Sequence, residues 1–187
     1  MKNKYDAVII GSGVIGCCIA FELTKLGYKT LNVDKLADAG MGSTAGSCAV
    51  IRFHYSTTEG VALAREGYFY WLDWPKYLEV RDPDGMATYR NTGALVFKTP
   101  INKNLSRVKA ALDEFGVGYL DLQPEEIERY LPNVNLASYF PQKWVDDPQF
   151  GEPTAKMIPG ALWIPESGYI SDPKLSTHNV MVAAQAK

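Results

Sequence analysis

The chain has 187 residues, of which 47% are hydrophobic and 21% charged, and its formal net charge is −2 at pH 7. This length suits one sizeable domain, or one domain with part of a second. The sequence has no basic cluster and no apolar run of membrane-spanning length, so it argues against a nucleic-acid partner, an anionic-membrane partner and a membrane span.

The first thirty residues or so predict a strand, a helix and a second strand. Tyr5–Ile10 is apolar and rich in β-branched residues, as is typical of a parallel strand covered on both faces. Val14–Leu26 repeats apolar residues at helical spacing, and Gly27 follows it at a C-terminal cap position. Thr30–Val33 predicts the second strand. Together these segments predict a βαβ unit.

The next part of the chain predicts a loop and then a long helix. Lys35–Ala49 is rich in small residues and predicts a loop that leads into a short helix. Ser56 and Glu59 match a capping box, with Ser56 at N-cap and Glu59 at N3. The helix that they begin is expected to bend or restart at Pro75, because proline does not fit a helix interior.

From Asp82 onward the pattern changes to that of a mixed region of strands and helices. The predicted strands are Thr92–Lys98, Val117–Leu122 and Ala161–Ile164, and the predicted helices are Leu105–Phe115, a short one at Pro124 and one from Asp172 to the end. Pro132–Pro159 is rich in Pro, Asp and Gln and predicts irregular structure. The carboxylates in turn-like stretches are interpreted as solvated loop residues: Asp82, Asp84, Asp146 and Asp147.

A glycine motif joins the first predicted strand to the first predicted helix. The sequence from Gly11 to Gly16 is Gly-Ser-Gly-Val-Ile-Gly. In a dinucleotide-binding turn, Gly11 allows the tight turn, Gly13 lets the backbone approach a pyrophosphate, and Gly16 lets the helix pack closely. Asp34 ends the second strand, where an acid accepts hydrogen bonds from a ribose and disfavours a 2′-phosphate. The motif therefore predicts a dinucleotide site; a glycine-rich turn in another α/β protein is the alternative.

Three further segments, Gly42–Arg52, Asn91–Phe97 and Gly168–Pro173, resemble the FAD-dependent D-amino-acid oxidase superfamily, in particular its sarcosine oxidase and sarcosine dehydrogenase branch. The resemblance implies an α/β fold, with a Rossmann-like FAD-binding βαβ unit and part of an α+β substrate domain. It implies an FAD-binding part at residues 1–85, a partial substrate domain at 86–165, and a return helix to the FAD domain at 166–187. Since family members are about twice as long, the chain looks like their N-terminal half.

The resemblance also implies FAD as the cofactor and assigns its contacts. The expected contacts are Gly11, Ser12, Gly13, Val14, Ile15, Gly16, Asp34, Lys35, Gly42, Ser43, Thr44, Ala45, Ser47, Ala49 and Ile51. Arg52 is a candidate for holding negative charge that develops on the reduced flavin, and a structural ion pair is an equal alternative. His54 is a candidate catalytic residue, and a structural histidine is the alternative. Ala45 and Ala49 stand where monomeric sarcosine oxidases carry a histidine and an arginine.

The function that follows from the resemblance is oxidation of the C–N bond of an amine or amino acid, by hydride transfer to the flavin. Two alternatives stay open: an NAD-dependent dehydrogenase, and a non-catalytic fragment or subunit that needs a partner chain. Cys17, Cys18 and Cys48 match no zinc or redox motif, so we expect no metal site and a reducing, cytoplasmic setting.

Overall fold

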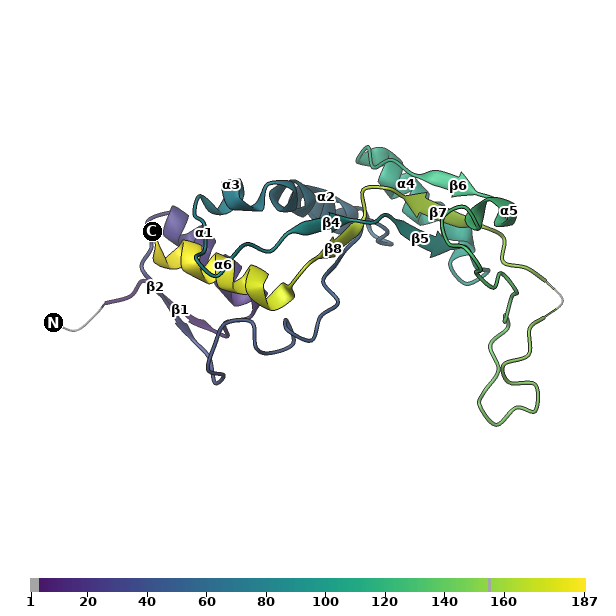
Figure 1. Ribbon diagram of the computed structural model, residues 1–187, viewed down its shortest axis with the longest axis horizontal. Coiled ribbons are helices and arrows are strands. Elements are labelled where there is room, and N and C mark those ends of the chain that lie inside the picture. Colours follow the sequence, from purple (N-terminus) through teal and green to yellow (C-terminus); the bar gives the residue numbers. More distant parts are fainter. Residues whose placement is uncertain (1–3, 155) are drawn as a thin grey trace. The chain divides into compact units, whose positions relative to one another are not determined.

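The computed structural model of the protein describes residues 4–154 and 156–187 (Figure 1). Its contacts divide the chain into two compact units that interleave along the sequence. The first unit consists of Met1–Ile51, Glu66–Arg90 and Gly168–Lys187, and the second of Arg52–Arg65 and Asn91–Ser167. The domain limits 1–85, 86–165 and 166–187 stay a prediction.

The first unit begins with the βαβ arrangement that the sequence predicts. The strand β1 (Ala7–Ile10) leads through the glycine turn into the helix α1 (Val14–Lys25), and β2 (Thr30–Val33) then pairs with β1 in parallel. The strands are four residues long each, which is two residues shorter than predicted for the first.

One face of this two-stranded sheet is apolar and exposed. Side chains alternate between the faces of a strand, and the register pairs Val8 with Leu31 and Ile10 with Val33 on one face. All four are exposed, and Ile10 is 92% exposed. The other face lies on α1, where the Asn32 side-chain amide donates to a helix carbonyl. The expectation that β1 is covered on both faces is therefore wrong for the described residues, in which α1 packs on one face and the other is exposed.

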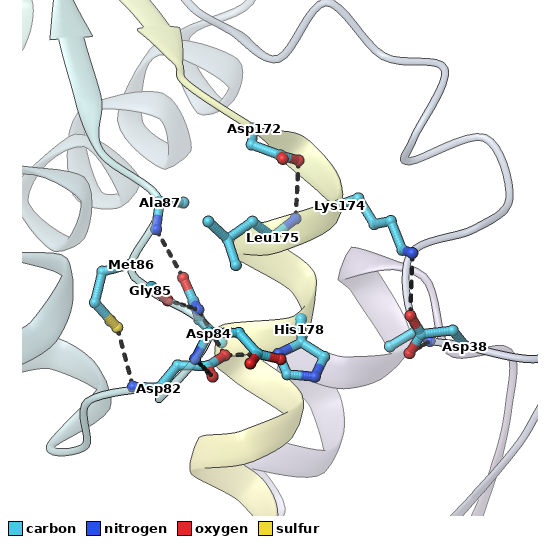
Figure 2. Close-up of polar contacts among 12 residues, drawn as sticks. Asp38, Asp82, Asp84, Gly85, Met86, Ala87, Asp172, Lys174, Leu175 and His178 are labelled. Carbon is cyan, nitrogen blue, oxygen red and sulfur yellow. Dashed lines mark hydrogen bonds and ion pairs between the residues drawn. The ribbon is translucent and has the colours of Figure 1, made fainter.

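The core of the first unit lies between α1 and the helix α6 (Pro173–Gln185), with the short helix α3 (Trp74–Leu78) against them. Its buried members are Cys17, Phe21, Ala39, Trp74, Leu78, Val180 and Ala183. The predicted start of α6 is confirmed: Asp172 is the N-cap, and its carboxylate accepts the Leu175 N–H at 2.9 Å (Figure 2).

A second sheet has the strand order β3–β8–β4. Its strands are β3 (Val50–Ile51), β8 (Gly168–Ile170) and β4 (Tyr89–Asn91). β3 and β8 pair antiparallel, with Val50 opposite Tyr169. The sequence did not predict these three strands. It indicated only that Gly168–Pro173 resembles the segment that returns to the FAD domain.

The second unit contains a three-stranded antiparallel sheet of order β5–β7–β6. Its elements are β5 (Ala94–Phe97), a 3-10 turn η1 (Lys103–Leu105), α4 (Ser106–Glu114), β6 (Leu120–Leu122), α5 (Pro124–Ile127) and β7 (Ala161–Ile164). The predicted strand Thr92–Lys98 is broken at Gly93, which has a φ of +69°. The Trp163 ring occupies the place of a side chain at Gly93, so a β-carbon would not fit there.

The long helix begins and ends differently from the prediction. α2 (Thr58–Leu72) starts after Thr57, whose hydroxyl accepts the Gly60 N–H at 3.2 Å, so Thr57 caps the helix instead of Ser56. The chain does restart before Pro75, because Asp73 caps α3 and accepts the Lys76 N–H at 3.3 Å. Residues 35–49 form turns without the short helix that was predicted. In the described part of the chain, no helix combines the length and the apolar character needed to cross a membrane.

Candidate cofactor site

The glycine turn holds the start of α1 directly against the end of β1. Gly11 has a φ of +108°, which favours glycine, and its N–H donates to the Val33 carbonyl at 2.7 Å. A β-carbon on Gly16 would overlap the Gly11 carbonyl oxygen and lie 3.0 Å from its carbonyl carbon. Glycine is therefore required at both positions for this short connection between strand and helix.

The N-terminus of α1 lacks a side-chain cap of its own. Gly13 is the N-cap residue, and the Val14 N–H donates instead to the Thr44 hydroxyl at 3.2 Å. A β-carbon on Gly13 would lie 3.1 Å from the same hydroxyl oxygen. Helix geometry leaves the N–H groups of Ile15 and Gly16 without intrahelical acceptors. This end of the helix can therefore bind an anionic oxygen, with the Thr44 hydroxyl beside it.

Asp34 lies at the end of β2 and points its carboxylate at the glycine turn. One oxygen accepts the Ser12 N–H at 2.6 Å, and the other accepts the Leu36 N–H at 2.9 Å. These hydrogen bonds, that from Ser12 first, hold the pKa of the carboxyl below its ordinary value. Asp34 is exposed and ionised at neutral pH, as an acceptor for ribose hydroxyls must be. Lys35 follows it and is also exposed.

The loop after Asp34 folds back onto the same turn. The Gly40 N–H donates to the Ser12 carbonyl at 2.8 Å, and the Ala45 N–H donates to the Gly40 carbonyl at 2.9 Å. The Ser47 N–H donates to the Thr44 carbonyl at 3.1 Å. The structure thus brings Thr44 to the glycine turn, through a docking point at Gly40 that was not predicted.

Ala49 joins this loop to β3 in a left-handed conformation. Its φ is +49°, its N–H donates to the Ser47 hydroxyl at 3.0 Å, and its carbonyl accepts the Ile170 N–H at 3.0 Å. A non-glycine residue in this region costs about 1–2 kcal/mol and needs surrounding contacts to hold it. The pairing of β3 with β8 supplies those contacts and fixes the direction in which the chain leaves the loop.

The two predicted catalytic residues, Arg52 and His54, belong to the second unit. The Arg52 guanidinium lies over the Tyr55 ring, 4.9 Å from its centroid, and is exposed. Across residues 4–154 and 156–187, no ion pair joins Arg52 to a carboxylate. Burial, and then the Arg52 charge, lowers the pKa of His54, and its Nδ1 is buried without a hydrogen-bond partner. Arg52 therefore has charge to offer an anion, and the His54 imidazole is neutral at pH 7.

One polar cluster of the first unit was not predicted (Figure 2). The Asp82 side chain is 1% exposed, so its interpretation as a solvated loop residue is wrong. Its carboxylate accepts the Asn179 amide at 2.8 Å and the Asp84 N–H at 3.0 Å, and the His178 Nδ1 lies 2.6 Å away. Burial opposes ionisation, but these hydrogen bonds still lower the pKa of Asp82.

The ligand atoms of Asp82, Asp84 and His178 lie within 4.8 Å of one another, which is close enough for a metal ion. The Asp82 oxygens, however, are already engaged by donors from α6 and from its own turn. Asn179 also donates to the Gly85 carbonyl and accepts the Ala87 N–H. The cluster therefore fixes the turn at 82–87 on α6, and we assign it a structural role. The Asp-Pro-Asp-Gly turn was its sequence signal.

Comparison with known proteins gives a family match and several relatives. The model of the protein family described as "FAD dependent oxidoreductase" matches residues 6–187. Human peroxisomal sarcosine oxidase is 27% identical over 136 residues, which make up 72% of this chain and 33% of that protein. Glycine oxidase of Bacillus licheniformis is 35% identical over 54 residues, 29% of this chain and 14% of that protein. The chain spans about a third of the length of the sarcosine oxidases that it matches.

Solved structures agree with the fold. The L-proline dehydrogenase from P. horikoshii superimposes with a TM-score of 0.72 at 23% identity, covering 100% of this chain and 43% of that one. The glycine oxidase from Geobacillus kaustophilus gives a TM-score of 0.68 at 22% identity, covering 97% and 44%. At these identities the likeness bears on the fold alone.

Proposed function

The chain belongs to the FAD dependent oxidoreductase family, and from this premise we propose that it forms the cofactor-binding part of an enzyme that oxidises the C–N bond of a small amino acid or amine. The observation that carries the proposal is the glycine turn: the N-terminus of α1, the Thr44 hydroxyl and the Asp34 carboxylate meet there. An anion-binding helix end beside a ribose-binding carboxylate is what an adenine dinucleotide requires.

In this proposal the pyrophosphate accepts hydrogen bonds from the first turn of α1 and from Thr44, and Asp34 accepts those of the ribose. The negative charge of Asp34 disfavours a 2′-phosphate, and therefore NADP. The proposed FAD contacts are Gly11, Ser12, Gly13, Val14, Ile15, Gly16, Asp34, Lys35, Gly42, Ser43, Thr44, Ala45, Ser47, Ala49 and Ile51. Small residues in the second part of this set allow the backbone to approach a flat ring closely.

Bound FAD supplies the acceptor for the hydride that leaves the substrate carbon. The chain's own contribution, in this proposal, is charge and proton handling. Arg52 holds an anionic group, either the carboxylate of the substrate or charge that develops at the cofactor, because its guanidinium has no ion pair among the described residues. His54 is neutral at pH 7 because its pKa is lowered, so it can accept a proton.

The names of the relatives guide the substrate class. They are called sarcosine oxidase, glycine oxidase and L-proline dehydrogenase, and these three compounds are small amino acids. A second candidate is a non-catalytic subunit that works with a partner chain. The exposed apolar face of β1 and β2 favours that candidate.

The cofactor proposal is tested by titrating the protein with FAD and following the quenching of flavin fluorescence. We expect FAD to bind and NADP not to bind. Thr44→Val should weaken FAD binding by about tenfold, since a hydrogen bond to a charged group contributes roughly 1.5 kcal/mol. Thr24→Val is the matched control at the other end of α1, where the hydroxyl bonds to the Phe21 carbonyl. Binding of NAD but not FAD would contradict the proposal.

Turnover is tested separately, with glycine, sarcosine and L-proline and an artificial electron acceptor. If the wild type reduces the acceptor and Arg52→Lys reduces it more slowly, the result supports the proposal that the protein is an enzyme. FAD binding without turnover of any of the three would instead favour the non-catalytic subunit.

A further inference from the structure

A projecting segment of the second unit, described at residues 138–154 and 156–157, exposes an unusual number of large apolar side chains. We call this segment the arm; it lies between α5 and β7 and loops away from the sheet β5–β7–β6 (Figure 1). Its exposed apolar residues are Tyr139, Phe140, Trp144, Val145, Phe150 and Met157. Trp144 is 85% exposed and Val145 79%. Single exposed apolar residues are common, but six within one short segment indicate a contact surface.

Hydrogen bonds of the backbone hold the arm together at its base and near its tip. At its base the Ser138 N–H donates to the Lys156 carbonyl, and the Thr154 N–H donates to the Ser138 carbonyl, both at 2.7 Å. Near its tip the Asp147 N–H donates to the Trp144 carbonyl at 3.0 Å, and the Phe150 N–H donates to the Asp147 carbonyl at 2.8 Å. The apolar side chains are therefore held on a defined backbone without being buried by it.

The charges of the arm narrow the choice of partner. It carries two lysines, Lys143 and Lys156, against three acids, Asp146, Asp147 and Glu152. The Lys143 ammonium is tied to the Gln149 side chain at 2.9 Å. An anionic membrane or a nucleic acid would require an excess of basic residues, which the arm lacks. A nearly neutral surface also imposes little repulsion when two identical copies approach each other.

The exposed area suits a second copy. A large aromatic side chain buries roughly 150–250 Å² when it is covered, so the six residues together offer on the order of 600 Å². A standard interface buries about 800 Å² per partner, and the polar rim of the arm supplies the remainder. Two copies related by a two-fold axis present the same patch to each other, so one self-complementary surface is sufficient.

We propose that the arm is a self-association surface through which two copies of this chain form a dimer, with Trp144 at the centre of the contact. Exposed tryptophans that become fully buried are common centres of binding energy. The contact is at the lower end of the size range of stable interfaces, so its stability depends on how well Trp144 is buried. Since the arm belongs to the second unit and shares no residue with the proposed FAD contacts, the proposal does not depend on the cofactor.

The proposal is tested by sedimentation equilibrium of the purified chain over a range of concentrations around ~1–100 μM. We expect a monomer–dimer equilibrium whose dissociation constant rises at least about tenfold in Trp144→Glu. Leu63→Glu is the matched control: Leu63 is 75% exposed on α2 in the same unit, and its replacement should leave the equilibrium unchanged.

Fluorescence gives an independent reading, because the other three tryptophans are buried or half-buried and Trp144 is exposed. The difference in acrylamide quenching between the wild type and Trp144→Phe reports the accessibility of Trp144. We expect this difference to shrink as the dimer forms. A chain that stays monomeric with Trp144 accessible would overturn the proposal. So would self-association that Trp144→Glu does not weaken, because the contact would then lie elsewhere.

Discussion

Replacing Gly16 with alanine is the sharpest test of the glycine turn. A β-carbon at this position overlaps the Gly11 carbonyl oxygen, so the strand end or the helix start must move by about 1 Å before ordinary contact is restored. Both are backbone, which gives less readily than a flexible side chain. Overpacking of this kind costs typically 1–3 kcal/mol. Alanine recovers about 1 kcal/mol in a helix, because it restricts the unfolded chain more than glycine does.

We expect Gly16→Ala to lower the free energy of unfolding by up to about 2 kcal/mol, which shifts the urea midpoint by as much as roughly 1 M. Gly67→Ala is the control, since the same change in α2 meets no atom within 4 Å. That variant should be as stable as the wild type or up to about 1 kcal/mol more stable. Urea unfolding followed by circular dichroism measures both. If the two variants shifted the midpoint equally, the close approach of Gly11 and Gly16 would not be the cause.

Three further predictions concern buried groups of the first unit. Asp82→Ala should lower the free energy of unfolding by about 2–3 kcal/mol, because buried donors lose their acceptor. The control Asp84→Ala, at an exposed residue, should change this free energy by less than about 0.5 kcal/mol. Thermal or urea unfolding measures both. The pKa of Asp82 is lowered in the folded protein. The ionised carboxylate therefore contributes its full stabilisation above about pH 4, and this contribution is lost as the pH falls through the lowered pKa. The free energy of unfolding of Asp82→Asn should therefore fall less steeply with decreasing pH than that of the wild type. Burial raises the pKa of both the Cys17 and the Cys18 thiol to about 11, whereas Cys48 is exposed. A thiol reagent at pH 8 should therefore modify Cys48 alone until denaturant is added, and rapid modification of all the thiols would contradict this burial.

The βαβ unit could be predicted because its signals are local. The glycine turn, the helical spacing of α1 and the run of β-branched residues in β2 all lie within about thirty residues of one another. The same holds for Asp172, where the cap and the following proline mark the start of α6. Local signals failed where two neighbouring residues could both cap a helix, as Ser56 and Thr57 could for α2. Only the folded backbone determines which hydroxyl reaches the Gly60 N–H.

The sheet β3–β8–β4 could not be predicted, because its strands have two or three residues and pair across long stretches of sequence. No periodic pattern can be read from two residues. Asp82 was misjudged for a related reason: its turn motif is typical of the surface, and its partners His178 and Asn179 lie almost a hundred residues later. The resemblance to a family predicts Thr44 as an FAD contact, but the docking of its loop at Gly40 depends on tertiary contacts.

The placement of α6 also has a consequence for the time at which the protein folds during synthesis. The glycine turn and α1 leave the ribosome well before α6, but their core is completed by Val180 and Ala183 on α6. At ~5–20 residues per second, the roughly 160 residues between Phe21 and Val180 take on the order of 10–30 s to make. The nascent β1–α1–β2 segment therefore waits with its apolar helix face uncovered, and it is the segment on which a chaperone would have most time to act.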